Sequence, residues 1–243
     1  MSHEILNEHR IIWEQKPVLR TIYEDYYQRL VAESRPGRTL EIGAGTGNLK
    51  SFLPDVISTD IVTSPWIDCA CDAQMMPFQD QSFDNIVMID VLHHIERPLK
   101  FFQEAQRVLR PGGRILMMEP AMTCLGRFFY HHFHEEPVNF NEYPLSEGDL
   151  DPKRKPFDAN QAFPHLIFET YAQDFTKLFP QFKILRVNYL SLFAYPLSGG
   201  FKKWQLIPAG VAKILIRMEK GFEAYLGKIL GFRMMIVVEK NTP

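Results

Sequence analysis

Three glycines and one acid stand close together early in the chain, in the run Glu41-Ile42-Gly43-Ala44-Gly45-Thr46-Gly47. Glycine tolerates positive φ angles and lets a ligand approach the main chain closely. A helix that starts after such a turn presents free N–H groups, which suit a polar or anionic group. Because Leu40 and Ile42, which flank Glu41, read as a buried strand before the turn, the pattern predicts a nucleotide-binding corner at the carboxyl edge of a parallel sheet.

A further acid, Asp60, ends the next stretch that has the character of a strand, residues 55–60. In doubly wound folds the acid at this place accepts hydrogen bonds from the two ribose hydroxyls. A carboxylate suits that task because it only accepts and can take both donors. The alternative is an aspartate that serves only the turn.

Two histidines, His93 and His94, follow the apolar run Ser82–Asp90. They are expected where the sheet order switches and a ligand crevice opens. Since a histidine can take a proton from a hydroxyl near neutral pH, both are catalytic candidates, and His94 is preferred. The alternative is that one packs structurally and the other caps the loop. Asp90 is a candidate for the cofactor side of the crevice, and Glu119, which ends the strand 114–120, for the substrate side.

The segment Tyr130–Pro137 is dense in histidine and glutamate, which are metal-ligand types. Adjacent His131 and His132 point apart on a regular element, so we predict no metal and assign His131 to a lid that contacts the substrate. Tyr23 and Tyr27, on an N-terminal helix, are further substrate candidates. The alternative for that helix is a cover over the sheet edge.

These residues need a framework of alternating strands and helices, typical of a doubly wound α/β fold. The expected helices are Ile11–Ala32, Leu49–Leu53, Pro98–Leu109, Thr170–Phe179 and Ala209–Leu230. The expected strands after the first two are Trp66–Cys71, Ser82–Asp90, Arg114–Pro120, Phe182–Tyr195 and Phe232–Lys240. Residues 1–36 form a helical arm, and 139–163 read as an irregular loop.

Composition is that of an ordinary globular protein, with 243 residues, 46% hydrophobic and 23% charged. A net charge of −2 gives no general attraction to nucleic acid, so none is expected as a partner. The 3 cysteines form no metal-type pair, and no apolar run is long enough to span a bilayer. Without a visible signal peptide, we predict a single cytoplasmic domain over 1–243.

Four motifs together resemble the class I S-adenosylmethionine-dependent methyltransferases, and most closely the type 11 (UbiE-like) family. They are the glycine run, Asp72-Ala73-Gln74-Met75-Met76-Pro77-Phe78, the line from Ser82 through Leu92-His93-His94-Ile95, and Arg107-Val108-Leu109-Arg110-Pro111-Gly112-Gly113. The resemblance covers roughly residues 38–120. It implies seven strands in the order 3-2-1-4-5-7-6, the last one antiparallel, and S-adenosylmethionine as cofactor, with S-adenosylhomocysteine as product. It also implies these cofactor contacts: Glu41, Gly43, Ala44, Gly45, Gly47, Asp60, Ile61, Asp72, Ala73 and Asp90.

Two segments, 121–166 and 196–231, depart from the family pattern and are expected to form a lid over the substrate pocket. Such an apolar roof suits a large or lipid-like acceptor, a membrane-associated one, or a homodimer interface. We therefore predict methyl transfer to a small-molecule or lipid-like acceptor, with the methylated atom open. A non-catalytic S-adenosylmethionine-binding module is the main alternative. A nicotinamide oxidoreductase is less favoured, because it predicts G-x-G-x-x-G and leaves the Asp72 segment unexplained.

Overall fold

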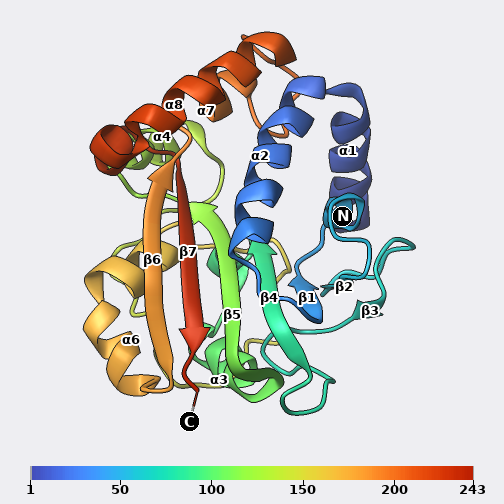
Figure 1. The fold of residues 1–243 in the computed structure, drawn as a ribbon, viewed down its shortest axis with the longest axis vertical. Coiled ribbons are helices and arrows are strands. Elements are labelled where there is room, and N and C mark those ends of the chain that lie inside the picture. Colours follow the sequence, from blue (N-terminus) through green and yellow to red (C-terminus); the bar gives the residue numbers. More distant parts are fainter. Residues whose placement is uncertain (1, 243) are drawn as a thin grey trace.

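The computed structural model describes residues 2–242, which form a seven-stranded sheet with helices on both faces (Figure 1). The strand order β3-β2-β1-β4-β5-β7-β6 confirms the predicted topology. β7 runs antiparallel to both of its neighbours, as expected. The strands are β1 (Thr39–Ile42), β2 (Ile57–Asp60), β3 (Cys69–Ala70), β4 (Phe83–Ile89), β5 (Leu109–Pro120), β6 (Phe182–Leu190) and β7 (Arg233–Lys240).

The central strands are apolar on both faces because each face carries its own core. On β5, Ile115 and Met117 enter one core, while Leu116 and Met118 enter the other. This alternation follows the two-residue period of a strand. The sheet is therefore a buried layer that holds the ends of its strands rigidly.

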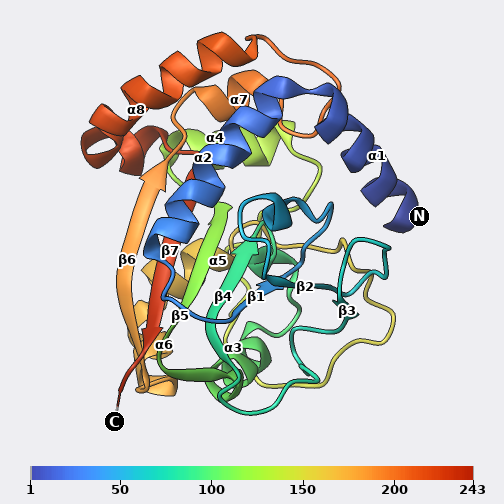
Figure 2. The same cartoon turned by 45° about the vertical axis from the view of Figure 1, so that its right-hand side comes forward.

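The helices divide between these two cores (Figure 2). One face is covered by α2 (Pro17–Glu33), α7 (Ala194–Ser198) and α8 (Ala209–Leu230), and the other by α3 (Pro98–Val108) and α6 (Ala172–Leu178). The remaining helices are α1 (Ser2–Gln15), α4 (Cys124–Phe133) and the short α5 (Phe163–His165). In the part of the chain described, no helix is both long and apolar enough to cross a bilayer.

The N-terminal arm is two helices instead of the single helix predicted over Ile11–Ala32. The break falls at Lys16, because Pro17 is disfavoured inside a helix but suits its first turn. The buried ammonium of Lys16 donates to the carbonyls of Gly200, Lys202 and Trp204 at 2.7, 2.7 and 2.8 Å. This side chain therefore ties the hinge between α1 and α2 to the turn that precedes α8.

Three other expected elements are shorter than predicted. The helix expected over Leu49–Leu53 is a single 3-10 turn at Asn48–Ser51, since few residues separate Gly47 from β2. β3 pairs with β2 only at Cys69 and Ala70, as suits an edge strand. β6 ends at Leu190 because Ser191 turns the chain with a φ of 60°.

β4 and β5 end toward the upper half of the molecule in Figure 1, where α4, α7 and α8 gather, and β1 and β2 run parallel to them. Residues that follow these strand ends meet there although they are distant in sequence. The candidate site lies along this carboxyl edge.

Candidate active site

The glycine turn after β1 uses its glycines for two different reasons. All three have positive φ angles, 67° at Gly43, 52° at Gly45 and 72° at Gly47. A Cβ at Gly43 would lie 2.3 Å from Val91, and one at Gly47 would lie 2.6 Å from Trp66. At Gly45 the nearest atom would be 3.9 Å away. Packing thus requires two of the glycines, while the main chain at Gly45 stays open to a ligand.

Asp60 stands beside this turn at the end of β2. Its Oδ2 accepts from Gly45 N at 2.9 Å and its Oδ1 from Val62 N at 2.8 Å. Burial raises the pKa of Asp60, against the lowering effect of these backbone donors. Each oxygen keeps a further lone pair. The next side chain, Ile61, is 54% exposed and offers an apolar surface beside the carboxylate.

Glu41 is turned inward, between β1 and β2. Its Oε2 accepts from Ser58 Oγ at 2.6 Å, and burial raises the pKa of Glu41 to about 7. Asp72, after β3, is partly exposed, and its Oδ1 accepts from the backbone N–H of Gln74 at 2.8 Å. Ala73 is buried next to it. The structure therefore places Glu41, Asp60 and Asp72 at one edge of the sheet. Glu41 lies beneath the glycine turn, where it bonds to Ser58.

A cavity of about 490 Å³ lies between α1 and the outer side of the glycine turn. Its walls include Arg10, Trp13, Thr46, Asn48 and Trp66. The Arg10 guanidinium stacks 4.5 Å from the centre of a Trp66 ring. The first helix is thus a direct neighbour of the turn.

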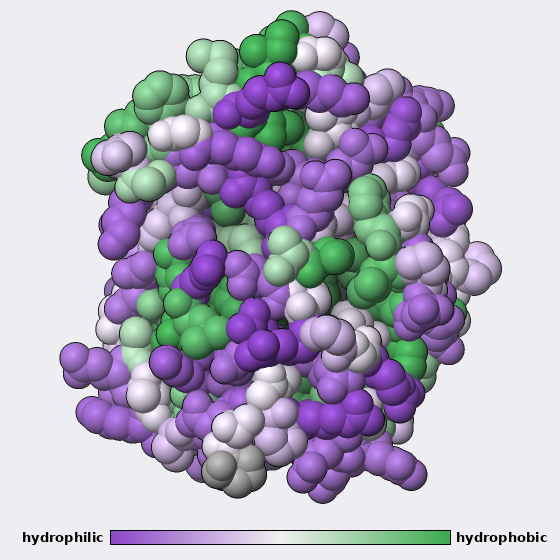
Figure 3. Space-filling view, viewed as in Figure 1, coloured by the Kyte–Doolittle hydropathy of each residue, from purple (hydrophilic) through white to green (hydrophobic). Residues whose placement is uncertain are grey.

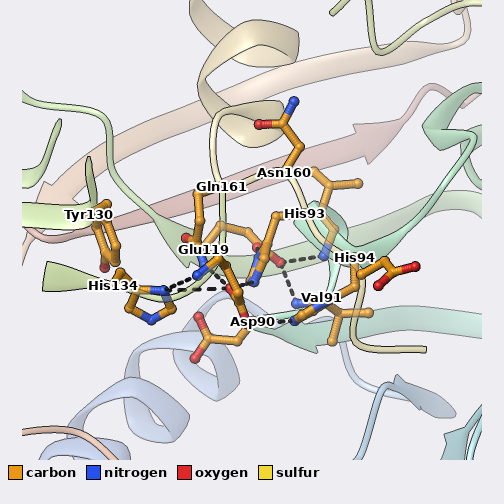
Figure 4. Close-up of polar contacts among 12 residues, drawn as sticks. Asp90, Val91, His93, His94, Glu119, Tyr130, His134, Asn160 and Gln161 are labelled. Atoms are coloured by element: carbon orange, nitrogen blue, oxygen red, sulfur yellow. Dashed lines mark hydrogen bonds and ion pairs between the residues drawn. The ribbon is translucent and has the colours of Figure 1, made fainter. Parts of the chain in front are cut away.

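Glu119, at the end of β5, organises a second polar cluster beside β4 (Figure 4). Its Oε1 accepts from the N–H groups of Val91 and Leu92 at 2.9 and 2.8 Å, and its Oε2 pairs with His93 Nδ1 at 2.7 Å. The side chain is fully buried. Glu119 is therefore a positioning residue for His93 in this structure, and its predicted place on the substrate side stays a prediction.

Glu136 closes this cluster from the other side. Its Oε2 lies 3.5 Å from His93 Nε2, and its Oε1 lies 3.8 Å from His94 Nε2. Burial alone would lower the pKa of His93, but the hydrogen bond and charge of Glu119, with those of Glu136, raise it to about 10. Burial alone would raise the pKa of Glu136, but the hydrogen bond and charge of His93 lower it to about 2.

His94 has the opposite character. Burial, together with the nearby charge of His93, lowers the pKa of His94 to about 4. Near neutral pH, His93 is therefore an imidazolium between two carboxylates, while His94 is an uncharged imidazole. Of the two catalytic candidates, only His94 has a free lone pair with which to accept a proton.

Asp90 is held in an uncommon backbone conformation between β4 and His93. Its φ is 58°, and both of its oxygens pair with the terminal nitrogens of Arg233, at the start of β7. Tyr23, on α2, donates to Asp90 Oδ2 at 3.1 Å. The structure thus brings Tyr23 to the cluster, whereas Tyr27 is buried and its ring packs 4.9 Å from that of Phe52.

His131 does not join the cluster. It is exposed on α4, where its ring lies edge-to-face with that of His132, with 4.9 Å between the ring centres. α4 ends at Phe133, and the chain then turns so that Glu136 reaches His93 and His94 instead. The residue of this segment that reaches the histidine cluster is therefore Glu136, and the role of His131 in a lid stays a prediction.

Sequence reasoning missed Glu136 and Arg233. The first lies in the segment that was singled out, but no spacing rule distinguishes it from its neighbours. The second did carry a signal, because an arginine at the start of a strand buried on both faces requires a carboxylate partner. Within residues 2–242, His93, His94 and Glu136 also offer ligand atoms within 4.8 Å of one another, a grouping of metal-ligand types.

The comparisons with known proteins point to a methyltransferase domain. Residues 40–117 match the family model described as a methyltransferase domain. The probable tRNA methyltransferase 9B of Bos taurus is 31% identical over 116 residues, covering 42% of this chain and 26% of that protein. The demethylmenaquinone methyltransferase of Renibacterium salmoninarum is 32% identical over 120 residues, covering 42% and 51%. The matches thus span about half or less of these curated relatives.

Two solved structures share the fold over nearly the whole chain. A methyltransferase from Thermotoga maritima, described as a possible histamine N-methyltransferase, has a TM-score of 0.55 at 17% identity and covers 93% of this chain and 91% of its own. A SAM-dependent methyltransferase from Archaeoglobus fulgidus has a TM-score of 0.54 at 14% identity and covers 93% and 95%. These likenesses confirm the fold class.

The fold and its carboxyl-edge motifs define a class I S-adenosylmethionine-dependent methyltransferase domain. Within that class, residues 40–117 match the methyltransferase-domain model, in agreement with the type 11 resemblance of the motifs. The family and fold imply S-adenosylmethionine as cofactor. The residues present suit it, because Gly45 leaves its main chain open, Asp60 keeps acceptor capacity and Ile61 offers an apolar surface.

Proposed function

We propose that this chain transfers a methyl group from S-adenosylmethionine to a small-molecule or lipid-like acceptor. The observation that carries the proposal is that the glycine turn with Asp60 and the uncharged His94 lie along the same edge of the sheet. The cofactor supplies an electrophilic methyl group when bound, because the carbon is attached to a sulfonium. The protein's part is then to hold and orient the reactants and to exclude water.

The cofactor would be held by residues from four strand ends. The main chain of the glycine turn would cradle the methionine and ribose parts, Asp60 the ribose hydroxyls, and Asp72 with Ala73 the adenine edge. Ile61 would pack on the adenine ring. Asp90, oriented by Arg233 and Tyr23, would face the methionine part.

His94 is the candidate base if the acceptor is a hydroxyl. Its low pKa keeps it unprotonated near neutral pH, and Glu136 and the charged His93 lie on one side of it. A carboxylate or amine acceptor that is already deprotonated needs no base. The acid–base role of His94 therefore depends on the acceptor.

The segment 121–166 would close the acceptor side. It supplies Glu136 and Gln161, which bond to each other, and Asn160, whose N–H donates to the carbonyl of His93 at 2.8 Å. The segment 196–231 would complete the roof above it through α8, which packs against α4. We therefore propose that the chain is a single domain in which these two segments form a lid over the substrate pocket.

Two observations bear on the acceptor class. The relatives named above carry the names of a tRNA methyltransferase and a quinone methyltransferase. The net charge of −2 favours a small or apolar acceptor over a polyanion. The expectations of no nucleic acid partner and of a cytoplasmic location remain predictions.

Transfer of label from methyl-labelled S-adenosylmethionine to fractions of a cell extract tests the proposal. We expect label in the lipid or small-molecule fraction, with the Asp60→Ala variant as a control for cofactor dependence. Label that nuclease treatment removes would overturn the acceptor class. If calorimetry shows binding of S-adenosylhomocysteine but no fraction takes label, the non-catalytic module becomes the better interpretation.

A further inference from the structure

The outer face of α8 carries a continuous stripe of large apolar side chains. They recur every three or four residues, which places them on one side of the helix: Val211, Ile214, Met218, Phe222, Tyr225 and Ile229. Their exposed fractions run from 40% for Val211 to 81% for Tyr225. Just before the helix, Trp204 and Leu206 are 48% and 71% exposed. Scattered exposed apolar residues are normal, but a patch of this length indicates an interaction surface.

The opposite face of α8 is firmly attached, so the stripe cannot turn inward. Glu223 accepts two hydrogen bonds from Arg29 of α2, both of 2.8 Å. Glu219 is buried and accepts from the N–H groups of residues 192–194 at 2.7 to 3.1 Å. Gly227 lies against the backbone of Tyr189, where a Cβ would come within 2.4 Å of the carbonyl oxygen.

The charged side chains of α8 that form no hydrogen bond or ion pair with the rest of the described chain are all positive. Both of its acids are engaged in the contacts to the protein body. Lys213, Arg217 and Lys228 are exposed and make no ion pair within residues 2–242. The exposed surface of α8 is therefore apolar along the stripe and positively charged along one side of it. Figure 3 shows apolar side chains gathered at the upper edge of the molecule, where α8 lies, next to hydrophilic ones.

We propose that α8 docks in the plane of an anionic lipid membrane. An amphipathic helix with Lys and Arg on its polar side and large apolar residues on the other binds at such an interface. The helix does not qualify as a membrane span, so it lies on the bilayer and does not cross it. Trp204 at its border is of a residue type that prefers the headgroup level. A second copy of this face would bring positive charges against the positive charges of α8, which repel each other. Anionic lipid instead brings negative charges, which attract them.

This inference is independent of the proposed methyl transfer, since lipid binding can be measured without cofactor or acceptor. The test is flotation of the full chain with vesicles made of equal parts phosphatidylcholine and phosphatidylglycerol, and with vesicles of phosphatidylcholine alone. We expect binding to the mixed vesicles that weakens as salt is added. No flotation with the mixed vesicles would overturn the proposal.

Two kinds of variant separate the apolar and ionic contributions. Phe222→Ser is expected to weaken binding about tenfold, from the loss of one inserted apolar side chain. Arg217→Gln is expected to weaken it about fivefold, from the loss of one basic charge near the surface. Leu178→Ser is the matched control, because Leu178 is 47% exposed on α6, at the other end of β6 from α8 (Figure 1).

Light scattering without vesicles tests the alternative that a second copy of the chain covers this face. If the chain is a dimer that Phe222→Ser converts to a monomer, the stripe is a self-interface and the membrane proposal fails. Calorimetry with S-adenosylhomocysteine on the same variants keeps the two proposals apart. A stripe variant that loses lipid binding but keeps cofactor affinity supports the docking role alone.

Discussion

Arg233 and Asp90 form a two-point ion pair at the carboxyl edge of the sheet, with Arg233 Nη2 2.9 Å from Asp90 Oδ2. The arginine side chain is 2% exposed and the aspartate 28%. The ring of Tyr195 lies 4.1 Å from the guanidinium carbon. A charge buried in this way depends on its partner, because water cannot replace it. The pair also fixes Asp90 in its left-handed conformation.

Removing one partner of this pair is expected to destabilise the protein more than removing both. Arg233→Met should lower the free energy of unfolding by about 3 kcal/mol, the lower end for a buried pair, because Asp90 retains some water contact. Arg233→Met with Asp90→Asn should recover part of that loss. Urea denaturation of the two single variants and the double variant measures the coupling. Strictly additive effects would show that the pair contributes nothing as a pair.

Asp60 is expected to contribute directly to cofactor affinity. Its loss removes charge-assisted hydrogen bonds of roughly 1.5–3 kcal/mol, so Asp60→Ala should weaken binding of S-adenosylhomocysteine by about tenfold or more. Calorimetry gives the dissociation constants. Asp55→Ala is the matched control, since Asp55 is exposed in the loop before β2.

A second variant guards against a purely structural effect of Asp60, which also holds Gly45 N. Asp60→Asn keeps an acceptor for that backbone donor but loses the charge. Equal affinity in wild type and both variants would remove Asp60 from the cofactor site.

His94 is expected to matter for turnover only as an uncharged base. For a hydroxyl acceptor, His94→Gln should lower kcat by about 10²–10⁴-fold. Because the pKa of His94 is lowered to about 4, kcat in the wild type should not fall with decreasing pH until near that value. His132→Gln, on the exposed side of α4, is the control. Unchanged turnover in His94→Gln would rule out the base role.

The charged His93 predicts how stability depends on pH. Its pKa rises from 6.5 unfolded to about 10 folded, so its contribution is fully present below pH 6.5 and is lost as the pH rises toward 10. Glu136 behaves in the opposite sense, because its pKa falls from 4.5 to about 2, and its contribution is lost as the pH falls through that range. Thermal unfolding of wild type and His93→Gln should therefore differ most near pH 6.5 and converge toward pH 10. A constant difference across this range would contradict the charged state of His93.

Metal removal is expected to leave the protein unchanged. His93, His94 and Glu136 are grouped closely enough for a metal, but a metal at His93 must displace a proton whose pKa is about 10. Chelator treatment should therefore alter neither S-adenosylhomocysteine binding nor turnover. Elemental analysis that finds a stoichiometric metal in the wild type, absent in Glu136→Gln, would overturn the prediction.

Features encoded by local patterns were predictable from the sequence. The bounds of α8, Ala209–Leu230, agree with the prediction because a helical period sustained over that length has few competing interpretations. The strand order followed from the family resemblance that the motifs between 38 and 120 carry. The break at Pro17 was also readable, since proline favours the first turn of a new helix over the interior of a long one.

Contacts between distant segments could not be predicted in the same way. Asp90 and Arg233 are 143 positions apart, and the sequence around either residue does not indicate that it pairs with the other. The difference between the two histidines is likewise tertiary, because it depends on Glu119 and Glu136 facing His93. The sequence marked both histidines as catalytic candidates, but only the fold makes His93 charged and His94 uncharged near neutral pH.

The three hydrogen bonds from Lys16 to backbone carbonyls couple α1 to the turn before α8. α1 borders the cavity next to the glycine turn, and the turn held by Lys16 leads into α8. A nucleoside that shifts α1 and a lipid surface that shifts residues 200–204 would strain the same three hydrogen bonds. By linkage, whatever factor the nucleoside applies to lipid affinity, lipid must apply to nucleoside affinity in return.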